Sequence, residues 1–406
     1  MKYCEECGAV PLYHRLEKIS TTIDLALRRF ILTRFIFEVM ERAGVYMVAH
    51  TNHDRVARRL AFFARLRLLT EKTDAEGETN TRVCALYEGA AARGVTLKRY
   101  MLFGTTQLCC VAEKQIGGKM ERVVFRIVPR PRGFVSPSLL WMDNKGILKG
   151  KLAEAHIPHA DGGVARTFKE ALALFHKIGA AVIIKPTLGS RGRHTTLDIR
   201  TEEELRKGFD IGMQITSEVV VERYLHGTVH RVTLVGGKPV AVARREYPHV
   251  IGDGVHTVEE LIDIENARPL RHGIHYRPLD KVNRIQASLK KQDLTFTSVP
   301  LKDQLVVLSD KNSRLHGTVT EDVTDTVHPD NGALFERLGE MLGDPIVGVD
   351  FMIGDMSRSW KEQPEAGVLE CNSMPFIDVH HEVVSGRKIN VAAYLWDVIF
   401  PPTTRG

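Results

Sequence analysis

The chain has 406 residues, of which 43% are hydrophobic, 26% charged and 7% aromatic, a composition that excludes disorder and a collagen-like repeat. Its net charge of +6 is unevenly distributed, because residues 1–139 contain 23 basic and 14 acidic side chains and the rest is slightly acidic. Such a surplus suits a face for nucleic acid, anionic lipid or an acidic substrate, and it equally suits an ordinary basic surface.

The sequence predicts a cytosolic protein. No run reaches the roughly 18 consecutive apolar residues of a membrane-spanning helix, and MKYCEECGAV lacks the apolar core of a signal peptide. Six cysteines in so long a chain do not form a disulfide framework and fit a reducing compartment.

Cys4 and Cys7 have the spacing of one half of a zinc site. A tetrahedral site needs two further thiolate or imidazole ligands, which His14 or the Cys109–Cys110 pair can supply only if the chain folds back. Reduced thiols at the surface are the favoured interpretation on the sequence alone.

Three helices and a hairpin are predicted before residue 129. Apolar residues at helical spacing predict helices over 20–43, 54–70 and 83–93, and alternation around Gly117–Gly118 predicts a hairpin over 105–128. The second helix carries an arginine face that could bind an anion or a partner. A solvated helix face is the favoured explanation for these arginines.

The segment PRPRGFVSP at 129–137 interrupts the periodic pattern and is the best linker candidate in the chain. Strands and helices alternate after it, which predicts an α+β or α/β module. The expected helices cover 143–155, 167–178 and 201–212, and the expected strands cover 180–186, 195–199 and 218–225.

A lysine ends the first of these strands and a loop with two glycines follows it. Lys185 precedes TLGSRGRH, in which glycine backbone amides and the arginines are suited to bind phosphate oxygens. The spacing is not that of a Walker A motif, since no Gly-Lys-Ser/Thr occurs here. This segment alone leaves nucleotide binding and a plain strand turn as equal alternatives.

Carboxylate and amide side chains also occur at the ends of two later strands. Asp350 lies in GVDFMIGD, and Glu370 and Asn372 lie in VLECNSMP, so adjacent strands would bring all three together. Mg²⁺ prefers such oxygen ligands, usually shared with substrate phosphates. Polar residues facing water on an open sheet are the alternative, and the phosphate loop upstream favours the metal site.

These strings, together with VVVERYLHGTVHRV, GDGVHTVEELI and DVTDTVHPDN, resemble the ATP-grasp ligases of the glutathione synthetase-like superfamily. Over 140–385 the chain is similar to the ATP-grasp domain of the cyanophycin synthetases. The resemblance implies an ATP-grasp fold of class α+β or α/β, with two lobes around the nucleotide and a separate basic N-terminal domain over 1–139. It assigns 140–400 to the ATP-grasp domain, with a lid lobe over about 165–225 and a metal-binding lobe over about 226–400.

The resemblance also assigns roles to individual residues. It implies that Lys145 and Lys185 bind ATP phosphates, that Arg231 and Arg271 are catalytic, and that Asp350, Glu370 and Asn372 bind Mg²⁺, or alternatively Mn²⁺. The remaining implied nucleotide contacts are in the lid loop, at Gly189, Ser190, Arg191, Gly192 and Arg193, and in the hinge, at Glu222, Arg223, Tyr224 and Leu225.

The implied activity is that of an ADP-forming acid–amino acid ligase. A carboxylate attacks the γ-phosphate of ATP to give an acylphosphate, and an amine displaces phosphate to leave an amide. Positioning and charge neutralisation dominate such a reaction, which agrees with the lysines, arginines and metal ligands. The expected partners are ATP and an amino-acid or peptide substrate, with acidic substrates as one option, and a homo-oligomer is expected. Neither a membrane nor nucleic acid is an expected partner.

Lys185 and the intact set of Asp350, Glu370 and Asn372 favour the enzyme, but departures from the family pattern leave an alternative function open. Val229 occupies the position where an acidic residue commonly binds the ribose, the 312–322 loop contains large side chains, and MPF at 374–376 replaces Pro-Gly. The alternative is a catalytically weakened ATP-grasp protein that binds nucleotide and regulates or scaffolds a partner. A polymer made by two alternating ligations is not expected from this chain alone.

Overall fold

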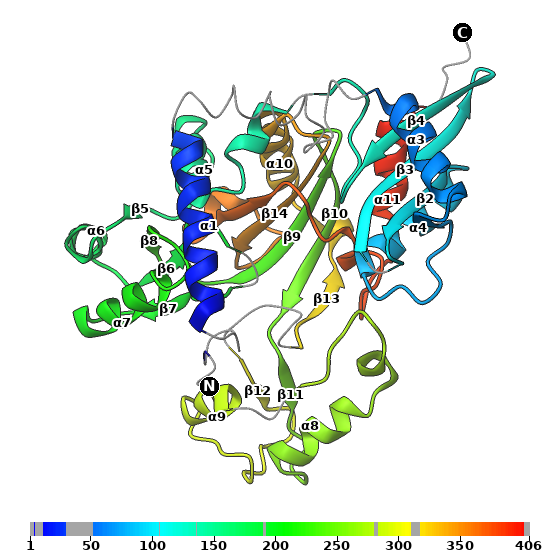
Figure 1. Cartoon of the computed structure of the whole chain (residues 1–406). Helices are drawn as coiled ribbons and strands as arrows, with labels where there is room; N and C mark the ends of the chain where they lie inside the picture. The colour runs from blue at the N-terminus through cyan, green and yellow to red at the C-terminus, as the bar shows by residue number, and fades with distance from the viewer. Residues whose placement is uncertain are drawn as a thin grey trace.

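Figure 1 shows the computed structural model, which describes residues 4, 11–29, 52–104, 106–134, 136–189, 192–279, 283–309 and 317–401. Its first helix, α1 (Pro11–Arg29), begins nine residues before the predicted start at Ser20, and the end of that prediction lies outside the described residues. The predicted start was wrong, and Thr21 and Thr22 lie inside the helix. Their hydroxyls donate to the carbonyls of Glu17 and Lys18 at 2.9 and 2.6 Å.

Four antiparallel strands, in the order β1-β2-β3-β4, form an N-terminal sheet. The predicted hairpin is confirmed, since Gly117 and Gly118 have φ angles of 54° and 78° and connect β3 to β4 through a two-residue turn. The helices and strands of this region are α3 (His53–Arg65), β1 (Leu69–Lys72), α4 (Thr81–Ala92), β2 (Thr96–Leu102), β3 (Thr106–Ile116) and β4 (Lys119–Phe125).

The C-terminal helix α11 (Val391–Ile399) packs against α4 and completes the core of this N-terminal sheet. Gly89 permits the close approach, because a Cβ atom there would lie 2.5 Å from the Cβ atom of Ala392. The Trp396 indole is fully buried and donates to the Leu86 carbonyl at 3.1 Å. Sequence-distant segments therefore share one core, and the predicted domain boundary at residue 139 stays a prediction.

A second sheet, here called the lid sheet, has the strand order β5-β8-β6-β7. Two helices pack on it, and each begins with a capping box in which a threonine and a glutamate satisfy each other's backbone amides: Thr167 with Glu170, and Thr201 with Glu204. The elements are β5 (Gly162–Ala165), α6 (Phe168–Ile178), β6 (Val182–Pro186), β7 (Thr196–Ile199), α7 (Glu202–Gly212) and β8 (Val219–Arg223).

The central sheet has five strands in the order β13-β10-β9-β14-β15, and α5 and α10 contribute to its hydrophobic core (Figure 1). Every described strand ladder is antiparallel, which confirms the α+β alternative over a parallel α/β sheet. The elements are α5 (Lys145–Glu154), β9 (Thr228–Val235), β10 (Lys238–Glu246), β13 (Val319–Asp322), α10 (Pro329–Leu342), β14 (Ile346–Ile353) and β15 (Gly367–Asn372).

A small subdomain with its own apolar cluster lies below the central sheet in Figure 1. It contains β11 (His249–Ile251), α8 (Val258–Asn266), α9 (Asn283–Lys290) and β12 (Leu305–Val307). Short 3₁₀ turns are η1 (Pro137–Leu140), η2 (Pro269–His272), η4 (Thr324–Thr326), η5 (Trp360–Glu362) and η6 (Ile377–Val379). Within the described ranges, no helix has the length and apolar character needed to cross a membrane.

Candidate active site

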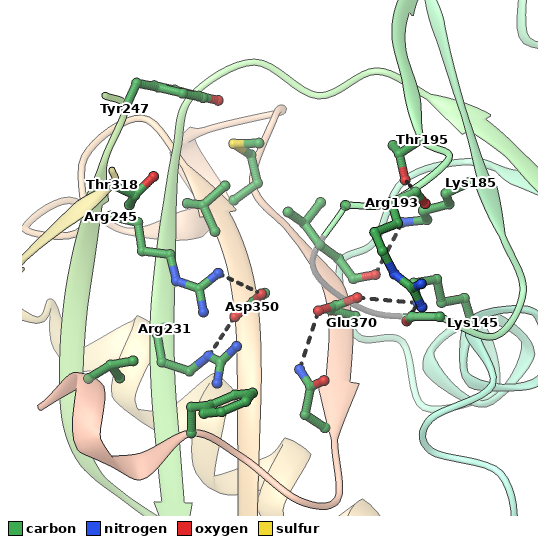
Figure 2. A pocket seen from close by; sticks show the side chains of 18 of the residues that line it. Lys145, Lys185, Arg193, Thr195, Arg231, Arg245, Tyr247, Thr318, Asp350 and Glu370 are labelled. Carbon is green, nitrogen blue, oxygen red and sulfur yellow. Dashed lines mark hydrogen bonds and ion pairs between the residues drawn. The ribbon is translucent and has the colours of Figure 1, made fainter. Parts of the chain in front are cut away.

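A cleft of about 560 Å³ has walls from both the lid sheet and the central sheet. Lys185 and Glu222 come from the lid sheet, and Arg231, Asp350 and Glu370 come from the central sheet. Residues 79–82, at the start of α4, also line it. Figure 2 shows Arg231 and Arg245 on one side of the two carboxylates, and Lys145, Lys185 and Arg193 on the other.

Two lysines converge on one buried carboxylate at the lid side of the cleft. Glu222 is 3% exposed and pairs with Lys185 through one oxygen and with Lys149 through the other, the latter at 2.8 Å. Burial alone would raise the pKa of Glu222, but the two ammonium groups lower it. Lys185 lines the cleft and also donates to the Leu369 carbonyl at 3.3 Å.

Asp350 occupies the centre of the opposite wall, between two guanidinium groups. Its oxygens accept from Arg231 Nε at 2.6 Å and from Arg245 Nη1 at 3.1 Å. Burial would raise the pKa of this carboxyl, but both arginines more than offset that effect and lower it. Gly348 leaves room for the Arg231 guanidinium, since a Cβ atom there would lie 2.9 Å from Nη1.

Glu370 and Asn372 lie beside Asp350 on the neighbouring strand. The register of β14 and β15 pairs Asp350 with Glu370 and Gly348 with Asn372. Glu370 contacts the Lys145 ammonium at 3.3 Å, and Lys145 also donates to the Gly189 carbonyl at 3.0 Å. The structure thus places the three predicted metal ligands on adjacent strands, facing the two predicted phosphate-binding lysines.

This donor set is compatible with Mg²⁺. Carboxylate and amide oxygens are the ligands that this hard cation prefers, and Glu370 keeps 26% of its side chain exposed to the cleft. Arg231 Nη1 is a buried donor without a hydrogen-bond partner among the described residues, which suits an anion beside it. The assignment of Asp350, Glu370 and Asn372 as metal ligands stays a prediction.

One end of the cleft is apolar. Leu225, Val229 and Met352 form a small cluster with Ala160 and Leu369. The first three and Leu369 line the cleft, as does Ile183 of the lid sheet. Val229 therefore contributes hydrocarbon surface where the family pattern commonly has an acidic side chain. This end can accept a flat apolar ring system between the two sheets.

Not every predicted site residue lines the cleft. Ser190 and Arg191 lie outside the described residues, whereas Gly189, Gly192 and Arg193 line the cleft, as do Arg223, Tyr224 and Leu225. Arg271 is 4% exposed and does not belong to the cleft lining. Its guanidinium binds Glu265 at 2.9 Å and the Gly317 carbonyl at 2.8 Å, so its predicted catalytic role has no geometric support.

Sequence reasoning missed four basic groups at or behind the cleft. Lys149 follows Lys145 by one helical turn, and this spacing was a usable signal. Arg245 ends a strand that pairs with β9, but its position opposite Asp350 depends on the sheet order. Arg82 reaches the cleft from the start of α4, and Arg277 reaches it from the segment between η2 and α9. No local sequence pattern indicates that these two side chains share a site.

A ligase could use a histidine as a base, and the candidates by sequence are the histidines at 230, 249, 275, 328, 380 and 381. Of these, His275 lines the cleft. The others make contacts elsewhere, for example His328, whose Nδ1 accepts from the Asp330 amide at the start of α10. His230 is buried, which lowers its pKa to about 4 and leaves it neutral near pH 7.

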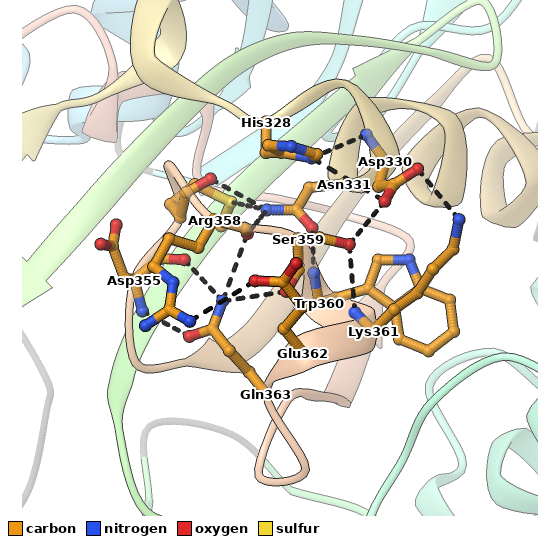
Figure 3. Close-up of polar contacts among 11 residues, drawn as sticks. His328, Asp330, Asn331, Asp355, Arg358, Ser359, Trp360, Lys361, Glu362 and Gln363 are labelled. Atoms are coloured by element: carbon orange, nitrogen blue, oxygen red, sulfur yellow. Dashed lines mark hydrogen bonds and ion pairs between the residues drawn. The ribbon is translucent and has the colours of Figure 1, made fainter.

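A polar network fixes the loop that leads into β15 (Figure 3). The fully buried Asn331 donates to the carbonyls of Met356 and Arg358, each at 2.9 Å, and accepts from the Trp360 amide at 2.8 Å. One side chain thereby satisfies three backbone groups of the loop between β14 and β15. The network anchors this loop to α10, behind the strands that carry Asp350 and Glu370.

We expect Asn331→Ala to lower the free energy of unfolding by about 3 kcal/mol, because it leaves buried backbone groups of the loop unsatisfied. Urea denaturation followed by circular dichroism measures the change. Ser357→Ala, on the exposed side of the same loop, is the control and should change the stability by less than about 0.5 kcal/mol. Equal effects of the two variants would contradict the anchoring role.

The lid sheet over a five-stranded antiparallel sheet, with a cleft between them, is the ATP-grasp architecture, so the predicted fold is confirmed. Among solved structures, the bifunctional glutathione synthetase from Pasteurella multocida superimposes with a TM-score of 0.58 at 26% identity. This match covers 79% of the present chain and 43% of that one.

Relatives by sequence agree with this fold and with the predicted resemblance. Over 257 residues the chain is 34% identical to a cyanophycin synthetase of Crocosphaera subtropica, covering 62% of the chain and 29% of that enzyme. Over 295 residues it is 32% identical to the glutathione biosynthesis bifunctional protein of Mannheimia succiniciproducens, covering 71% of the chain and 39% of that protein. No protein-family model matches the chain. The chain therefore spans less than half the length of these relatives.

Proposed function

We propose that this chain is an ATP-dependent carboxylate–amine ligase that forms an amide or peptide bond through an acylphosphate. The observation that carries the proposal is the arrangement of Asp350, Glu370 and Asn372 opposite Lys145 and Lys185 across one cleft (Figure 2). The similarity to cyanophycin synthetase and to the bifunctional glutathione proteins supports the same class of reaction.

The chemistry of the two ends of the cleft suggests how ATP would be oriented in it. The apolar end with Ile183, Leu225 and Met352 suits adenine, and Lys145 and Lys185 suit the phosphates. Mg²⁺, held by Asp350, Glu370 and Asn372, would neutralise phosphate charge when bound. Arg231, aligned by Asp350, is poised to stabilise the transferred phosphoryl group.

The carboxylate substrate is best accommodated at the basic part of the cleft that the nucleotide does not fill. Arg82, Arg245 and Arg277 line the cleft together with His275 and Tyr247. These donors favour an amino-acid or peptide substrate with carboxylate groups. The four arginines of α3, at 55, 58, 59 and 65, are exposed and do not line the cleft, so the N-terminal region would contribute through residues 79–82 instead.

Arg277→Ala should raise the KM for the carboxylate substrate by about tenfold, because one charge-assisted contact is lost, and should leave the KM for ATP unchanged. The simultaneous replacement of Arg55, Arg58, Arg59 and Arg65 by alanine is the control and should leave both values within about twofold. Steady-state kinetics with each substrate varied in turn make the comparison. An effect confined to the four helix arginines would contradict this substrate site.

The identity of the substrates follows from a screen. Purified protein with Mg²⁺ and ATP is incubated with amino acids and short acidic peptides, and products are measured by mass spectrometry. A ligase yields a product whose mass equals two candidates joined with loss of water, together with ADP. The alternative, a nucleotide-binding regulator, is supported if ATP binds tightly while no candidate pair yields a product or phosphate above blank.

A further inference from the structure

We propose that Cys4, His14 and His194 bind a zinc ion that fastens the N-terminus of the chain to the lid sheet. The ligand atoms of these three side chains all lie within 4.8 Å of one another, although Cys4 and His194 are 190 residues apart in sequence. One thiolate and two imidazoles form a donor set that zinc favours, and they differ chemically from the oxygen ligands of the active-site cleft.

The distance between Cys4 and His194 is close to that expected for two ligands of one zinc ion. Zinc bonds of about 2.3 Å to sulfur and 2.0 Å to nitrogen, at tetrahedral angles, place the two ligand atoms about 3.6 Å apart. Cys4 Sγ lies 4.0 Å from His194 Nε2, so a contraction of a few tenths of an ångström suffices. The centroids of the His14 and His194 imidazole rings lie 4.8 Å apart, and the planes of the two rings make an angle of 83°. The rings therefore meet edge to face and are not stacked in parallel.

His194 is oriented as a metal ligand would be. Its Nδ1 lies 3.0 Å from the Ile211 carbonyl, and because a carbonyl only accepts, Nδ1 carries the proton and Nε2 keeps its lone pair. A backbone carbonyl that fixes the other ring nitrogen is the usual support of a zinc-bound histidine. The residue is fully buried and has a φ of +53°, a backbone conformation that non-glycine residues rarely adopt.

Helix α1 holds the cluster in place by contacts along its length. Lys18 donates to the Met213 carbonyl at 2.7 Å, and the Thr21 hydroxyl donates to the Ile215 carbonyl at 2.8 Å, just beyond α7. Glu17 accepts from Arg193 at 2.7 Å. The helix therefore lies against the lid region (Figure 1), and His14 faces His194 from a fixed position.

The three side chains leave one position of a tetrahedral site for water or another protein group. Cys7, which has the sequence spacing of a zinc ligand relative to Cys4, lies outside the described residues and is not part of the proposed set. The structure does not bring Cys109 or Cys110 into the cluster; both are buried in strand β3.

The proposed ion would act on residues next to the cleft lining. His194 directly follows Arg193, which lines the cleft, and Gly192. A metal bond to His194 would restrict the motion of Gly192 and Arg193, independently of whether the protein proves to be a ligase. Metal removal should therefore increase hydrogen exchange in residues 192–215 and in α1.

The metal content of the purified full chain tests the site directly. The protein, prepared without chelators, is incubated with ZnCl₂, desalted and measured by inductively coupled plasma mass spectrometry. We expect about one zinc per chain, and less than a fifth of that in Cys4→Ser and in His194→Gln. The controls are Cys84→Ser and His176→Gln, which change a cysteine and a histidine outside the cluster and should keep the full zinc content.

A second measurement decides the question even if the variants fold poorly. Co²⁺ added to the metal-free wild-type chain should give the intense visible bands of a tetrahedral site and a thiolate-to-cobalt charge-transfer band, both displaced by Zn²⁺. A desalted wild-type chain without zinc, a weak octahedral cobalt spectrum, or a folded Cys4→Ser variant with full zinc content would overturn the proposal.

Discussion

Replacing Glu370 by glutamine should lower the turnover of ATP at least about 100-fold while the protein stays folded. Glutamine keeps the size of the side chain but removes the negative charge that faces Lys145 and that is proposed to bind Mg²⁺. Glu370 is 26% exposed and its partner Lys145 also donates to the Gly189 carbonyl, so this substitution should disturb the fold less than a substitution of Asp350, which would leave the buried Arg231 without its carboxylate. Phosphate release at saturating Mg²⁺ and ATP measures the loss.

Glu362→Gln is the matched control for this variant. Glu362 lies on the same β14–β15 hairpin, is 64% exposed and pairs only weakly with Arg358 at 3.4 Å. Its substitution should leave turnover within about twofold, and thermal unfolding should be similar for both variants. If Glu370→Gln turned over ATP at the wild-type rate, the proposed role of the Glu370 carboxylate in binding Mg²⁺ would be contradicted.

Replacing Lys185 by methionine should lower kcat/KM for ATP about 100- to 1,000-fold, since a phosphate-binding cation is lost from the cleft. The same change should destabilise the fold by about 3 kcal/mol, because the buried Glu222 keeps only one of its two ammonium partners. A second variant can distinguish the loss of kcat/KM for ATP from the loss of stability.

Lys149→Met separates stability from ATP use. Lys149 pairs with the other oxygen of Glu222, but it does not belong to the cleft lining. This variant should lose a similar amount of stability in urea denaturation, yet keep kcat/KM for ATP within about tenfold below its melting temperature. Equal losses of kcat/KM in both variants would mean that Lys185 acts only through the ion pair.

Local sequence patterns predicted the parts of the site that lie on regular strands. Glu370 and Asn372 are two residues apart on β15, so their side chains lie on the same face of that strand. The pairing of β14 with β15 then brings Asp350 beside them. Lys185 was predictable for a similar reason, because it ends an apolar strand immediately before a glycine loop.

The remaining parts depend on tertiary structure that no local pattern encodes. Arg82 and Arg277 lie almost 200 residues apart, and only the packing of α4 and of the small subdomain brings them to one cleft. The family motif assigns Arg271 to catalysis, but its guanidinium donates to Glu265 and to two carbonyls. His194 meets Cys4 and His14 only because α1 packs against the lid region.

The central claim is that a carboxylate of the substrate attacks the γ-phosphate of ATP. In that reaction one carboxylate oxygen forms the bond to phosphorus, ADP leaves, and the same oxygen departs with phosphate when the amine forms the amide. With a substrate carrying ¹⁸O in its carboxylate, the account predicts inorganic phosphate that contains one ¹⁸O atom for each amide formed. Unlabelled phosphate beside an amide product, or AMP that carries the label, would contradict it.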